Sequence, residues 1–267
     1  MGDQFERVVV TAGASGIGRA IVDAFLATGA RVHVADRDAE AVAALPSDNE
    51  NLTASIADVA DVQDVALMFA EARSHMGSVS ILINCAGIAG PTGVLEEIDP
   101  AAWRQCIAVN LDASFLCAQQ VIPEMKAAGA GAIINMSSTA GLFGYPMRTP
   151  YASAKWALIG LTKSLAMELG PWGIRVNAIC PGSVEGPRMD AVIGAEAIKR
   201  GTTEDSVRQV YTSGVSLRTF VAAEDIANMA VFLCSPLGAK VSGQALPVDG
   251  HTEFNGTMEF NETVEKK

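Results

Sequence analysis

The sequence predicts an α/β fold built on a doubly wound parallel sheet of about seven strands, with helices on both faces. Short runs rich in β-branched residues alternate with longer segments of helical spacing along most of the 267 residues, which is typical of right-handed βαβ units. The runs near Val8 and Ile81 are apolar almost throughout, as strands buried on both faces should be. Hydrophobic residues make up 49% of the chain and charged residues 18%, the balance of a globular protein.

The elements can be followed in order along the chain. Strands are expected where β-branched residues cluster, at residues 7–11, 31–35, 52–56, 79–84, 132–137, 174–179 and 244–248. Helices are expected where apolar residues recur every three or four positions, at residues 16–28, 39–45, 62–76, 101–126, 151–169 and 223–234. No internal repeat or linker divides the chain, so residues 1–267 are expected to form a single domain.

The chain is acidic, with 19 Lys and Arg against 30 Asp and Glu and a net charge of −11. Such a surface repels phosphate backbones and anionic lipids, so neither nucleic acid nor a membrane is an expected partner. The N-terminus has no basic region followed by a long apolar stretch, and five scattered cysteines form no C-x-x-C pair. A cytoplasmic protein with reduced thiols is therefore expected.

Two segments interrupt the alternation. Residues 186–214 form a long stretch of mixed charge and helical character between the sixth and seventh strands. A long insertion near the carboxyl ends of strands often covers a ligand, so this segment is expected to be a substrate lid, the alternative being a static pair of surface helices. The polar tail at residues 252–267 is expected to fray or to pack on a neighbouring subunit.

Turn-forming and small polar residues gather where the parallel strands end, which is where open α/β sheets bind ligands. TAGASGIG follows the first strand and opens a helix, and its Gly13, Gly16 and Gly18 let the backbone approach a pyrophosphate. Asp36 closes the second strand, where a carboxylate accepts hydrogen bonds from both ribose hydroxyls and repels a 2′-phosphate. NAD is therefore the expected cofactor, with NADP as the alternative if the adjacent Arg37 turns toward such a phosphate.

Tyr151 and Lys155 indicate the chemistry. They are spaced i and i+4 on the helix that opens with YASAK, so both side chains project from one face. An ammonium beside a phenol favours the phenolate and lowers the pKa of the tyrosine from its ordinary value near ~10. Such a tyrosine can exchange a proton with an alcohol or a carbonyl, and Ser138 at the end of the fifth strand could hydrogen-bond the same oxygen. Taken alone, Y-x-x-x-K is more often an ordinary surface pair on a helix.

In combination these motifs resemble the short-chain dehydrogenase/reductase family, in its single-domain branch. The landmarks run in order over nearly the whole chain: TAGASGIG, Asp36, Asp58 with Val59, NCAG, Asn110 in VNLDASF, NMSS, YASAK, PG and SGQALPVDG. The resemblance implies a Rossmann fold, a nicotinamide cofactor, and reversible hydride transfer between that cofactor and an alcohol or ketone. It also implies a homotetramer, which suits the apolar residues on more than one side of the helices at 101–126 and 151–169.

The resemblance assigns a role to each matching position. Tyr151 is implied as the general acid/base, Lys155 as the cation that lowers its pKa and binds the nicotinamide ribose, and Ser138 as the group that polarises the substrate oxygen. Asn110 is implied to hold a water that links Lys155 to a proton relay. The implied cofactor-binding residues are Gly13, Ser15, Gly16, Ile17, Gly18, Asp36, Arg37, Asp58, Val59, Asn84, Ala86, Gly87, Tyr151, Lys155, Pro181, Gly182 and Val184.

Three positions depart from the family pattern. Ala12 stands where the family has its first glycine after the threonine, which puts the local geometry of the turn in question. Cys85 replaces the second asparagine of N-N-A-G and removes a polar group that helps to join the strands. Gly186 replaces the threonine five residues after the proline of P-G, so another group or a water must meet the nicotinamide amide.

The leading interpretation is an NAD-dependent dehydrogenase of a secondary alcohol, or the corresponding ketone reductase. The alternative from another class is a non-catalytic NAD-sensing or scaffold protein on the same fold. The presence of all four implied catalytic residues favours the enzyme. A sugar-nucleotide epimerase or dehydratase would need a longer substrate domain after Pro181 than the chain provides.

The substrate is less clearly indicated. Arg148 and Arg188 are the candidate contacts, and they would suit a small polar or anionic hydroxy compound. Arg148 could equally be a solvated surface charge or an interface residue. No metal is expected, because His33, His75 and His251 are far apart and have no ligand spacing with carboxylates.

Overall fold

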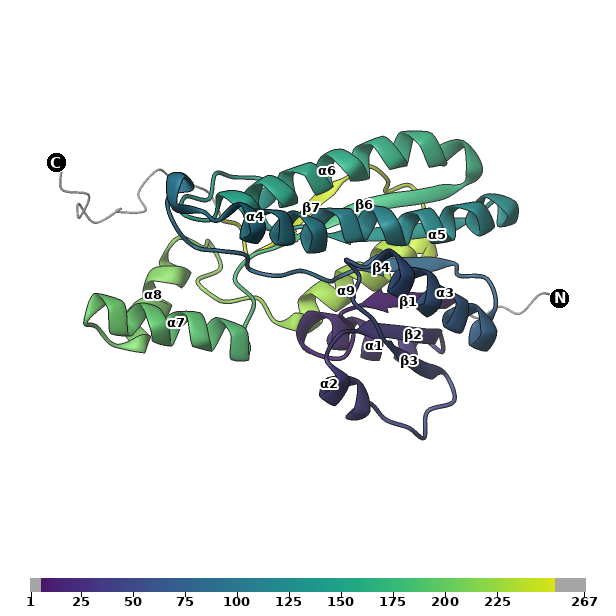
Figure 1. The fold of residues 1–267 in the computed structure, drawn as a ribbon, viewed down its shortest axis with the longest axis horizontal. Coiled ribbons are helices and arrows are strands. Elements are labelled where there is room, and N and C mark those ends of the chain that lie inside the picture. The colour runs from purple at the N-terminus through teal and green to yellow at the C-terminus, as the bar shows by residue number, and fades with distance from the viewer. Residues whose placement is uncertain (1–5, 253–267) are drawn as a thin grey trace.

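The structure is a computed structural model and describes residues 6–252, with the side chains of residues 188, 195 and 199 outside the description. Its centre is one parallel sheet of seven strands, in the order β3-β2-β1-β4-β5-β6-β7, as the sequence predicts (Figure 1). The strand order reverses between β1 and β4, which is the place where open sheets of this kind bind ligands. The strands are β1 (Arg7–Thr11), β2 (Arg31–Asp36), β3 (Leu52–Ile56), β4 (Ile81–Asn84), β5 (Gly131–Met136), β6 (Ile174–Pro181) and β7 (Ala245–Val248).

Helices cover both faces of this sheet, and alternate residues of each central strand enter separate cores. In β1, Val8 and Val10 pack in the core that contains α1 and α9, whereas Val9 packs in the core that contains α3 and α5. Each such side chain, when fully buried, contributes about 1.5–3 kcal/mol to stability. The helices are α1 (Gly16–Ala27), α2 (Ala39–Ala43), α3 (Val62–Met76), α4 (Pro100–Ile107), α5 (Ala113–Ala128), α6 (Thr149–Leu169), α7 (Pro187–Arg200), α8 (Glu204–Ser213) and α9 (Ala223–Cys234).

The helix expected at residues 101–126 is not one regular helix. It divides into α4 and α5, which are joined by a π-helical turn at Ala108–Asp112. Within this turn, the Asn110 side-chain amide donates to the Cys106 carbonyl at 2.9 Å and to the Ile88 carbonyl at 3.0 Å. The side chain thus bonds a carbonyl of the preceding turn and holds the helix to the loop after β4. Such bulges are often found at functional sites.

The combined helical stretch Pro100–Ala128 is the one segment of residues 6–252 that is long and apolar enough to cross a membrane. Length and composition are weak support for a span, because core helices of soluble proteins meet the same criteria. Here α5 packs on β4 and β5 and contributes Cys117, Val121 and Met125 to the core.

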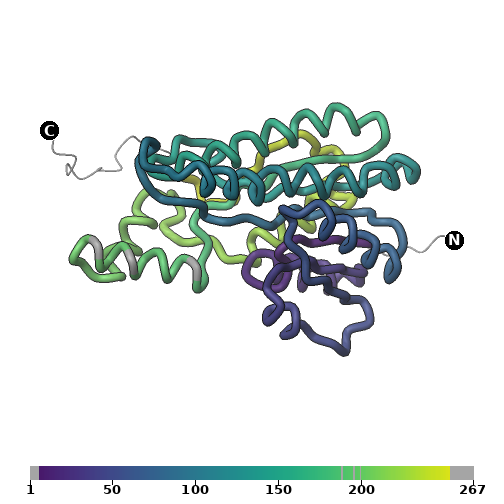
Figure 2. The backbone as a smooth tube through the Cα atoms, viewed as in Figure 1, coloured from purple at the N-terminus to yellow at the C-terminus, as the bar shows by residue number. Residues whose placement is uncertain are grey.

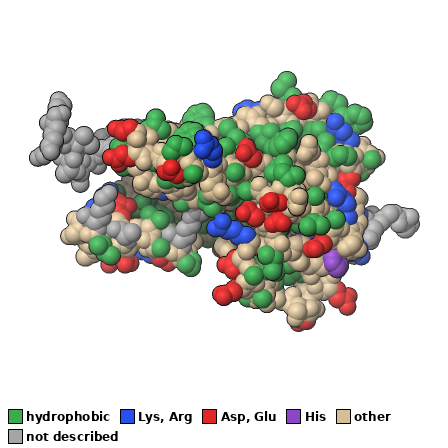
Figure 3. Space-filling model, in the orientation of Figure 1, with side chains coloured by type: hydrophobic (Ala, Val, Ile, Leu, Met, Phe, Trp, Pro, Cys, Tyr) green, Lys and Arg blue, Asp and Glu red, His purple; other side chains and the backbone are tan. Residues whose placement is uncertain are grey.

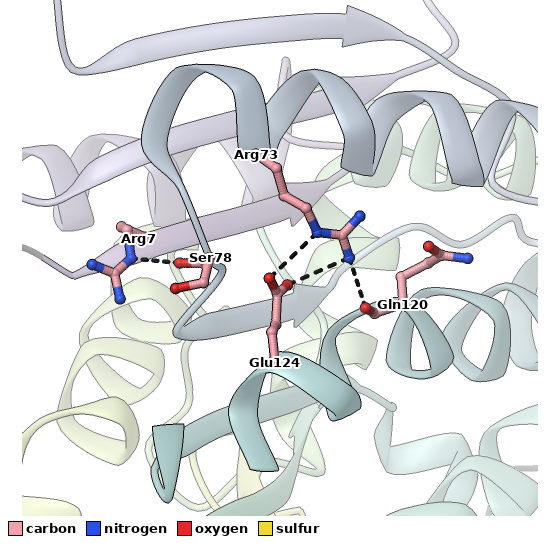
Figure 4. A network of polar contacts seen from close by, with 5 residues as sticks. All are labelled: Arg7, Arg73, Ser78, Gln120 and Glu124. Atoms are coloured by element: carbon pink, nitrogen blue, oxygen red, sulfur yellow. Dashed lines mark hydrogen bonds and ion pairs between the residues drawn. The ribbon is translucent and has the colours of Figure 1, made fainter. Parts of the chain in front are cut away.

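A polar network joins helices α3 and α5, which lie on the same face of the sheet (Figure 4). The Arg73 guanidinium, on α3, donates to the Gln120 carbonyl at 2.7 Å and to the Glu124 carboxylate at 3.3 Å, both on α5. Beside these residues, the Arg7 side chain donates to the Ser78 carbonyl. The Arg73 bonds hold α3 and α5 together without contacting the carboxyl ends of the strands.

A second buried network joins β2 to β3. His33 is 1% exposed, and its ring nitrogens lie 2.8 Å from the hydroxyls of Thr53 and Ser55. The Ser55 hydroxyl also donates to the Glu71 carboxylate on α3. Burial lowers the pKa of His33 from 6.5 to about 4, although Glu71 opposes the shift. The imidazole is therefore neutral at physiological pH.

The insertion between β6 and β7 forms the expected helical pair, α7 and α8, which projects beyond the carboxyl ends of the strands (Figure 2). Ile193, Ala197 and Val207 form a small core between the two helices. Arg208 of α8 forms an ion pair with Asp190 of α7. The pair thus has internal contacts of its own. The behaviour predicted for the C-terminal tail concerns residues 253–267, which lie outside the described part of the chain.

Candidate active site

In the turn after β1, the backbone lies close to the end of β2 and to the start of α1. The Ala12 amide donates to the Ala35 carbonyl at 2.6 Å, which fixes the turn beside β2. A Cβ on Gly18 would lie 2.0 Å from the Ala12 carbonyl oxygen, so only glycine allows α1 to begin this close to the turn. Ala12 has a φ of +52°, a left-handed conformation that costs a non-glycine residue about 1–2 kcal/mol. The first departure from the family pattern is thus accommodated as local strain.

The N-terminus of α1 faces this turn. Ser15 precedes the helix in an extended conformation, and its side chain makes no capping hydrogen bond. The first amides of α1 therefore have no side-chain acceptor and carry the positive end of the helix dipole. An anion such as a pyrophosphate fits this position. The other predicted cofactor-binding residues in this region are Gly13, on the turn, and Gly16 and Ile17, in the first turn of α1.

Asp36 is held rigidly at the end of β2. Its carboxylate accepts the Ala14 amide at 3.2 Å and the Asp38 amide at 3.1 Å, and the side chain is 9% exposed. The Ala14 bond ties the acid to the glycine-rich turn, and the Asp38 bond ties it to the segment that opens α2. The neighbouring Arg37 is exposed and forms no ion pair with a described residue. The carboxylate, not the guanidinium, thus has a fixed position here.

The end of β4 is joined to β1 through a hydroxyl. Thr11 Oγ1 accepts the amides of Cys85 and Ala86, both at 3.0 Å. The Asn84 side chain turns into the core, where it donates to the Asn135 side chain of β5 at 2.9 Å. The polar link between strands that the family pattern places at residue 85 is therefore supplied by residue 84. The Asn84 Oδ1 is buried and accepts no hydrogen bond from a described residue.

The remaining predicted cofactor residues lie at two further strand ends. After β3, Asp58 accepts the Ala60 amide at 2.9 Å and Val59 is buried. After β6, the Gly182 amide donates to the Val248 carbonyl at 3.0 Å, and Val184 pairs with residue 221 in an isolated bridge. Together with Pro181, the last residue of β6, they line the same edge as Asp36.

Tyr151 and Lys155 lie in the first turns of α6. Lys155 is 3% exposed, and its ammonium donates to the Met136 carbonyl at the end of β5, 2.8 Å away. The same ammonium lies 5.5 Å from the centroid of the Tyr151 ring. The i, i+4 spacing thus places a fixed positive charge beside the phenol, as the sequence predicts.

Ser138 follows β5 and faces the same helix. Its Oγ accepts the Ala140 amide at 3.1 Å, so the hydroxyl proton remains available for a second partner. The loop is held on α6 by Ser137, whose hydroxyl donates to the Lys155 carbonyl at 3.0 Å. A Cβ on Gly141 would lie 2.8 Å from that carbonyl oxygen. Ser137 and Gly141 are positioning residues that the sequence analysis missed, since no spacing marks them.

Asn110 reaches the site from the π-helical turn. It is 1% exposed, and among the described residues its Oδ1 has no hydrogen-bond donor. A Cβ on Gly87 would lie 2.9 Å from this oxygen and 3.4 Å from the Lys155 ammonium, so both groups border the same small space. A buried acceptor of this kind is commonly satisfied by an ordered water. The geometry therefore brings Asn110 and Lys155 together.

Of the two arginines predicted to contact the substrate, only Arg148 has a side chain in the described part of the structure. Arg148 immediately precedes α6, and its guanidinium lies 5.5 Å from the Tyr151 ring centroid. The side chain is partly buried and lies beside the predicted acid/base. The side chain of Arg188 lies outside the described part of the structure, so its predicted role stays a prediction.

The described cysteines do not add nucleophiles to the site. Burial raises the pKa of Cys85 to about 12 and that of Cys180 to about 11. Thiols of this kind stay protonated and unreactive near neutral pH. Within residues 6–252, no three His, Cys, Asp or Glu side chains gather to hold a metal ion. The polar groups at the strand ends therefore leave Tyr151 as the group best placed to move a proton.

The family model described as short chain dehydrogenase matches residues 6–197. The chain belongs to this family. This dehydrogenase is 36% identical over 250 residues to 2-(S)-hydroxypropyl-CoM dehydrogenase 3 of Xanthobacter autotrophicus, covering 92% of this chain and 95% of that protein. It is 37% identical to cis-4-hydroxycyclohexanecarboxylate dehydrogenase of Sinomonas cyclohexanicum, covering 94% and 98%.

Solved structures agree with this assignment. The crystal structure of levodione reductase superimposes with a TM-score of 0.85 at 27% identity, covering 92% of this chain and 98% of that one. A 3-ketoacyl-(acyl-carrier-protein) reductase from Brucella melitensis, complexed with NADH, gives 0.82 at 28% identity, covering 92% and 97%. The predicted Rossmann fold and family are confirmed. The dehydrogenase is a nicotinamide-dependent oxidoreductase of alcohols and ketones, and nothing favours a non-catalytic NAD sensor or scaffold.

Proposed function

We propose that this dehydrogenase uses NAD to oxidise a secondary alcohol, or NADH to reduce the corresponding ketone, and that its substrate is a small polar or anionic hydroxy compound. The observation that carries the cofactor choice is the Asp36 carboxylate, buried at the end of β2 and held by two backbone amides. A fixed carboxylate there accepts hydrogen bonds from the ribose hydroxyls and repels a 2′-phosphate. The exposed Arg37 has no comparable constraint.

The cofactor choice can be tested with Asp36→Ala. This variant should lower kcat/KM for NAD by about 10–100-fold and raise the use of NADP relative to NAD, because a charged hydrogen-bond acceptor and a repulsive charge are both removed. Arg37→Ala serves as the matched control and should leave kcat/KM for NAD near the wild-type value. A wild-type protein that prefers NADP, with the preference lost in Arg37→Ala, would contradict the proposal.

The bonds already described support the proposed catalytic roles. Lys155, bonded to Met136, holds its positive charge beside Tyr151, and the Tyr151 oxygen takes the proton of the alcohol after releasing its own proton to the water relay. Ser138 accepts from Ala140 and donates its own proton to the substrate oxygen. Asn110 Oδ1 accepts a water that carries the proton away past Lys155.

The cofactor supplies the second half of the reaction. When bound, the cofactor would supply the acceptor for the hydride of the carbinol carbon. The residues that would hold it are the glycine-rich turn, Asp36, Asp58 with Val59, and the strand ends at Ala86, Gly87, Pro181, Gly182 and Val184. The uncapped amides of α1 and the oriented carboxylate of Asp36 fit a dinucleotide.

The substrate class is supported by the names of relatives. Several act on hydroxy compounds with an acidic group, among them D-beta-hydroxybutyrate dehydrogenase of Rhizobium meliloti, 32% identical over 249 residues. The cis-4-hydroxycyclohexanecarboxylate dehydrogenase is another. Together with the cationic Arg148 beside Tyr151, these names favour a hydroxy acid over a neutral sugar or a sterol for this enzyme.

We expect the enzyme to be a cytoplasmic homotetramer. The outer faces of α5 and α6 expose Phe115, Trp156 and Met167, and apolar side chains are scattered over the helical layer in Figure 3. Exposed apolar surface on these long helices suits a symmetric interface. Light scattering at micromolar protein should give about four times the chain mass. A mass of 27.8 kDa, that of one chain, would refute the assembly.

We also propose that residues 186–214 act as a lid on this single-domain enzyme. The pair of helices has its own small core, and it begins at Gly186, whose φ of +136° favours glycine. The surface is hollowed between this pair and the layer that contains α4 and α6 (Figure 3). Gly186 also lacks the side chain that would otherwise fasten the segment to the cofactor. Closure should therefore depend on bound ligands.

Hydrogen exchange across residues 186–214 should slow when NAD and substrate are added together, and less with NAD alone. The helices on the sheet, such as α3, provide an internal reference that should not change. If Arg188 closes over the substrate, Arg188→Ala should raise KM for the substrate more than it alters NAD affinity. Exchange that is equally slow with and without ligands would mean that the segment is a fixed wall.

A further inference from the structure

Arg148 occupies a constrained position beside the proposed acid/base. It is the residue immediately before α6, three positions before Tyr151. Its guanidinium lies 5.5 Å from the Tyr151 ring centroid and 5.8 Å from that of Tyr145. One terminal nitrogen, Nη2, donates to the Ala89 carbonyl in the loop after β4, 2.7 Å away. The guanidinium is therefore held between the loop that borders the nicotinamide end and the helix that carries the tyrosine.

The charge of Arg148 is fixed in place but not neutralised. No carboxylate of the described residues lies within ion-pair distance of it, and its Nε is buried without an acceptor. Such a group is costly, because a buried donor without a partner loses about 1–3 kcal/mol. Elsewhere in residues 6–252, several arginines have a carboxylate partner: Arg19, Arg73, Arg200 and Arg208 pair with Asp23, Glu124, Glu196 and Asp190.

An uncompensated guanidinium in a partly buried site is suited to an anionic ligand. The planar fork of an arginine matches a carboxylate, and one bond to Ala89 leaves further N–H groups for it. The chain as a whole carries a net charge of −11 and repels anions. A local cation is therefore needed if the enzyme is to bind one.

Resting on the proposed function, we propose that Arg148 is the residue that selects the substrate, by binding a carboxylate close to the carbinol. The guanidinium lies over the same ring whose hydroxyl takes the alcohol proton. Because the guanidinium lies 5.5 Å from the centre of that ring, we expect a ligand held at both points to have a short link between its carboxylate and its hydroxyl. The substrate class is thus the short 2-hydroxy or 3-hydroxy acids and the matching oxo acids.

The proposal is tested by comparing charged and uncharged substrates. Wild-type enzyme should oxidise lactate or 3-hydroxybutyrate with higher kcat/KM than 2-butanol. Arg148→Met should lower kcat/KM for the better hydroxy acid by about 10²-fold, as expected for a lost charged hydrogen bond, and change that for 2-butanol by less than about threefold. Arg148→Lys, which keeps the charge but not the fork, should fall between. Arg104→Met removes an exposed positive charge on α4 and should have no effect.

A binding measurement separates this proposal from the reaction itself. Butyrate and butyramide have nearly the same shape but differ in charge and in one hydrogen-bonding group, and calorimetry on the NADH-loaded protein should show tighter binding of butyrate, a preference that Arg148→Met abolishes. Arg148-dependent butyrate binding without oxidation of any alcohol would refute the proposed reaction and leave the anion site standing. Equal binding of the two probes by wild type, or equal loss of activity on both substrate types in Arg148→Met, would overturn the anion site and leave the reaction standing.

Discussion

Replacing Tyr151 by phenylalanine is expected to lower turnover by at least ~10²-fold. The substitution keeps the ring beside its two cations, Lys155 and Arg148, and removes the hydroxyl that we propose exchanges a proton with the substrate oxygen. Because the ring remains, the first turn of α6 and the Lys155 bond to Met136 should persist. Steady-state oxidation of the best hydroxy substrate with NAD measures the loss.

NADH binding is the control for the Tyr151→Phe variant, and we expect its dissociation constant to stay within about threefold of wild type. A further control is the melting temperature, which should not fall. Full turnover in Tyr151→Phe would eliminate the tyrosine as acid/base. A loss of turnover that is matched by an equal loss of NADH affinity would show that the residue acts on cofactor binding instead.

The second large effect that we expect is a loss of folding stability in acid, caused by protonation of His33. In the folded state burial lowers the pKa of this imidazole to about 4, against 6.5 for a histidine exposed to water. Between these two values the unfolded chain binds a proton that the folded chain does not. The stability that the folded protein gains from a neutral, buried His33 is therefore fully present above pH 6.5. It declines as the pH falls and is lost by about pH 4. Its size is about 3 kcal/mol.

Urea unfolding between pH 7 and pH 4 tests this dependence. The free energy of unfolding of wild type should fall by about 3 kcal/mol more than that of His33→Gln, whose amide can still bond the hydroxyls of Thr53 and Ser55. His75→Gln, which changes an exposed histidine, should keep the wild-type slope. Parallel curves for wild type and His33→Gln would show that His33 does not remain neutral in the folded protein.

Most of the fold could be predicted because hydrophobic periodicity reports burial directly. β1, β3, α3 and α9 have the predicted bounds to the residue. The exception is the helix at 101–126, where apolar spacing does not distinguish i→i−4 bonds from the wider π turn. That turn depends on the Asn110 amide reaching two carbonyls, one of them in a distant loop. Such tertiary bonds leave no periodic trace in the sequence.

In the candidate active site, too, local features could be predicted from the sequence and long-range contacts could not. The i, i+4 pair of Tyr151 and Lys155 and the acid at the end of β2 are local patterns, and the structure places them as the spacing predicts. The direction of the Asn84 side chain, into the core, depends on Asn135 in another strand. The position of Arg148 depends on the Ala89 carbonyl across the site. These contacts join segments far apart in the sequence, so spacing alone could not predict them.

The central claim, that the protein is an NAD-dependent dehydrogenase of hydroxy compounds, is tested most directly by one assay. Purified enzyme is incubated with NAD or NADP and a panel of hydroxy acids, polyols, sugars, simple secondary alcohols and sterols, and the ultraviolet absorbance of the reduced nicotinamide is followed. We expect reduction of NAD, faster than that of NADP, with a short hydroxy acid as the best substrate. Absence of reduction with every alcohol and both cofactors, by a protein that still binds NADH, would contradict the claim.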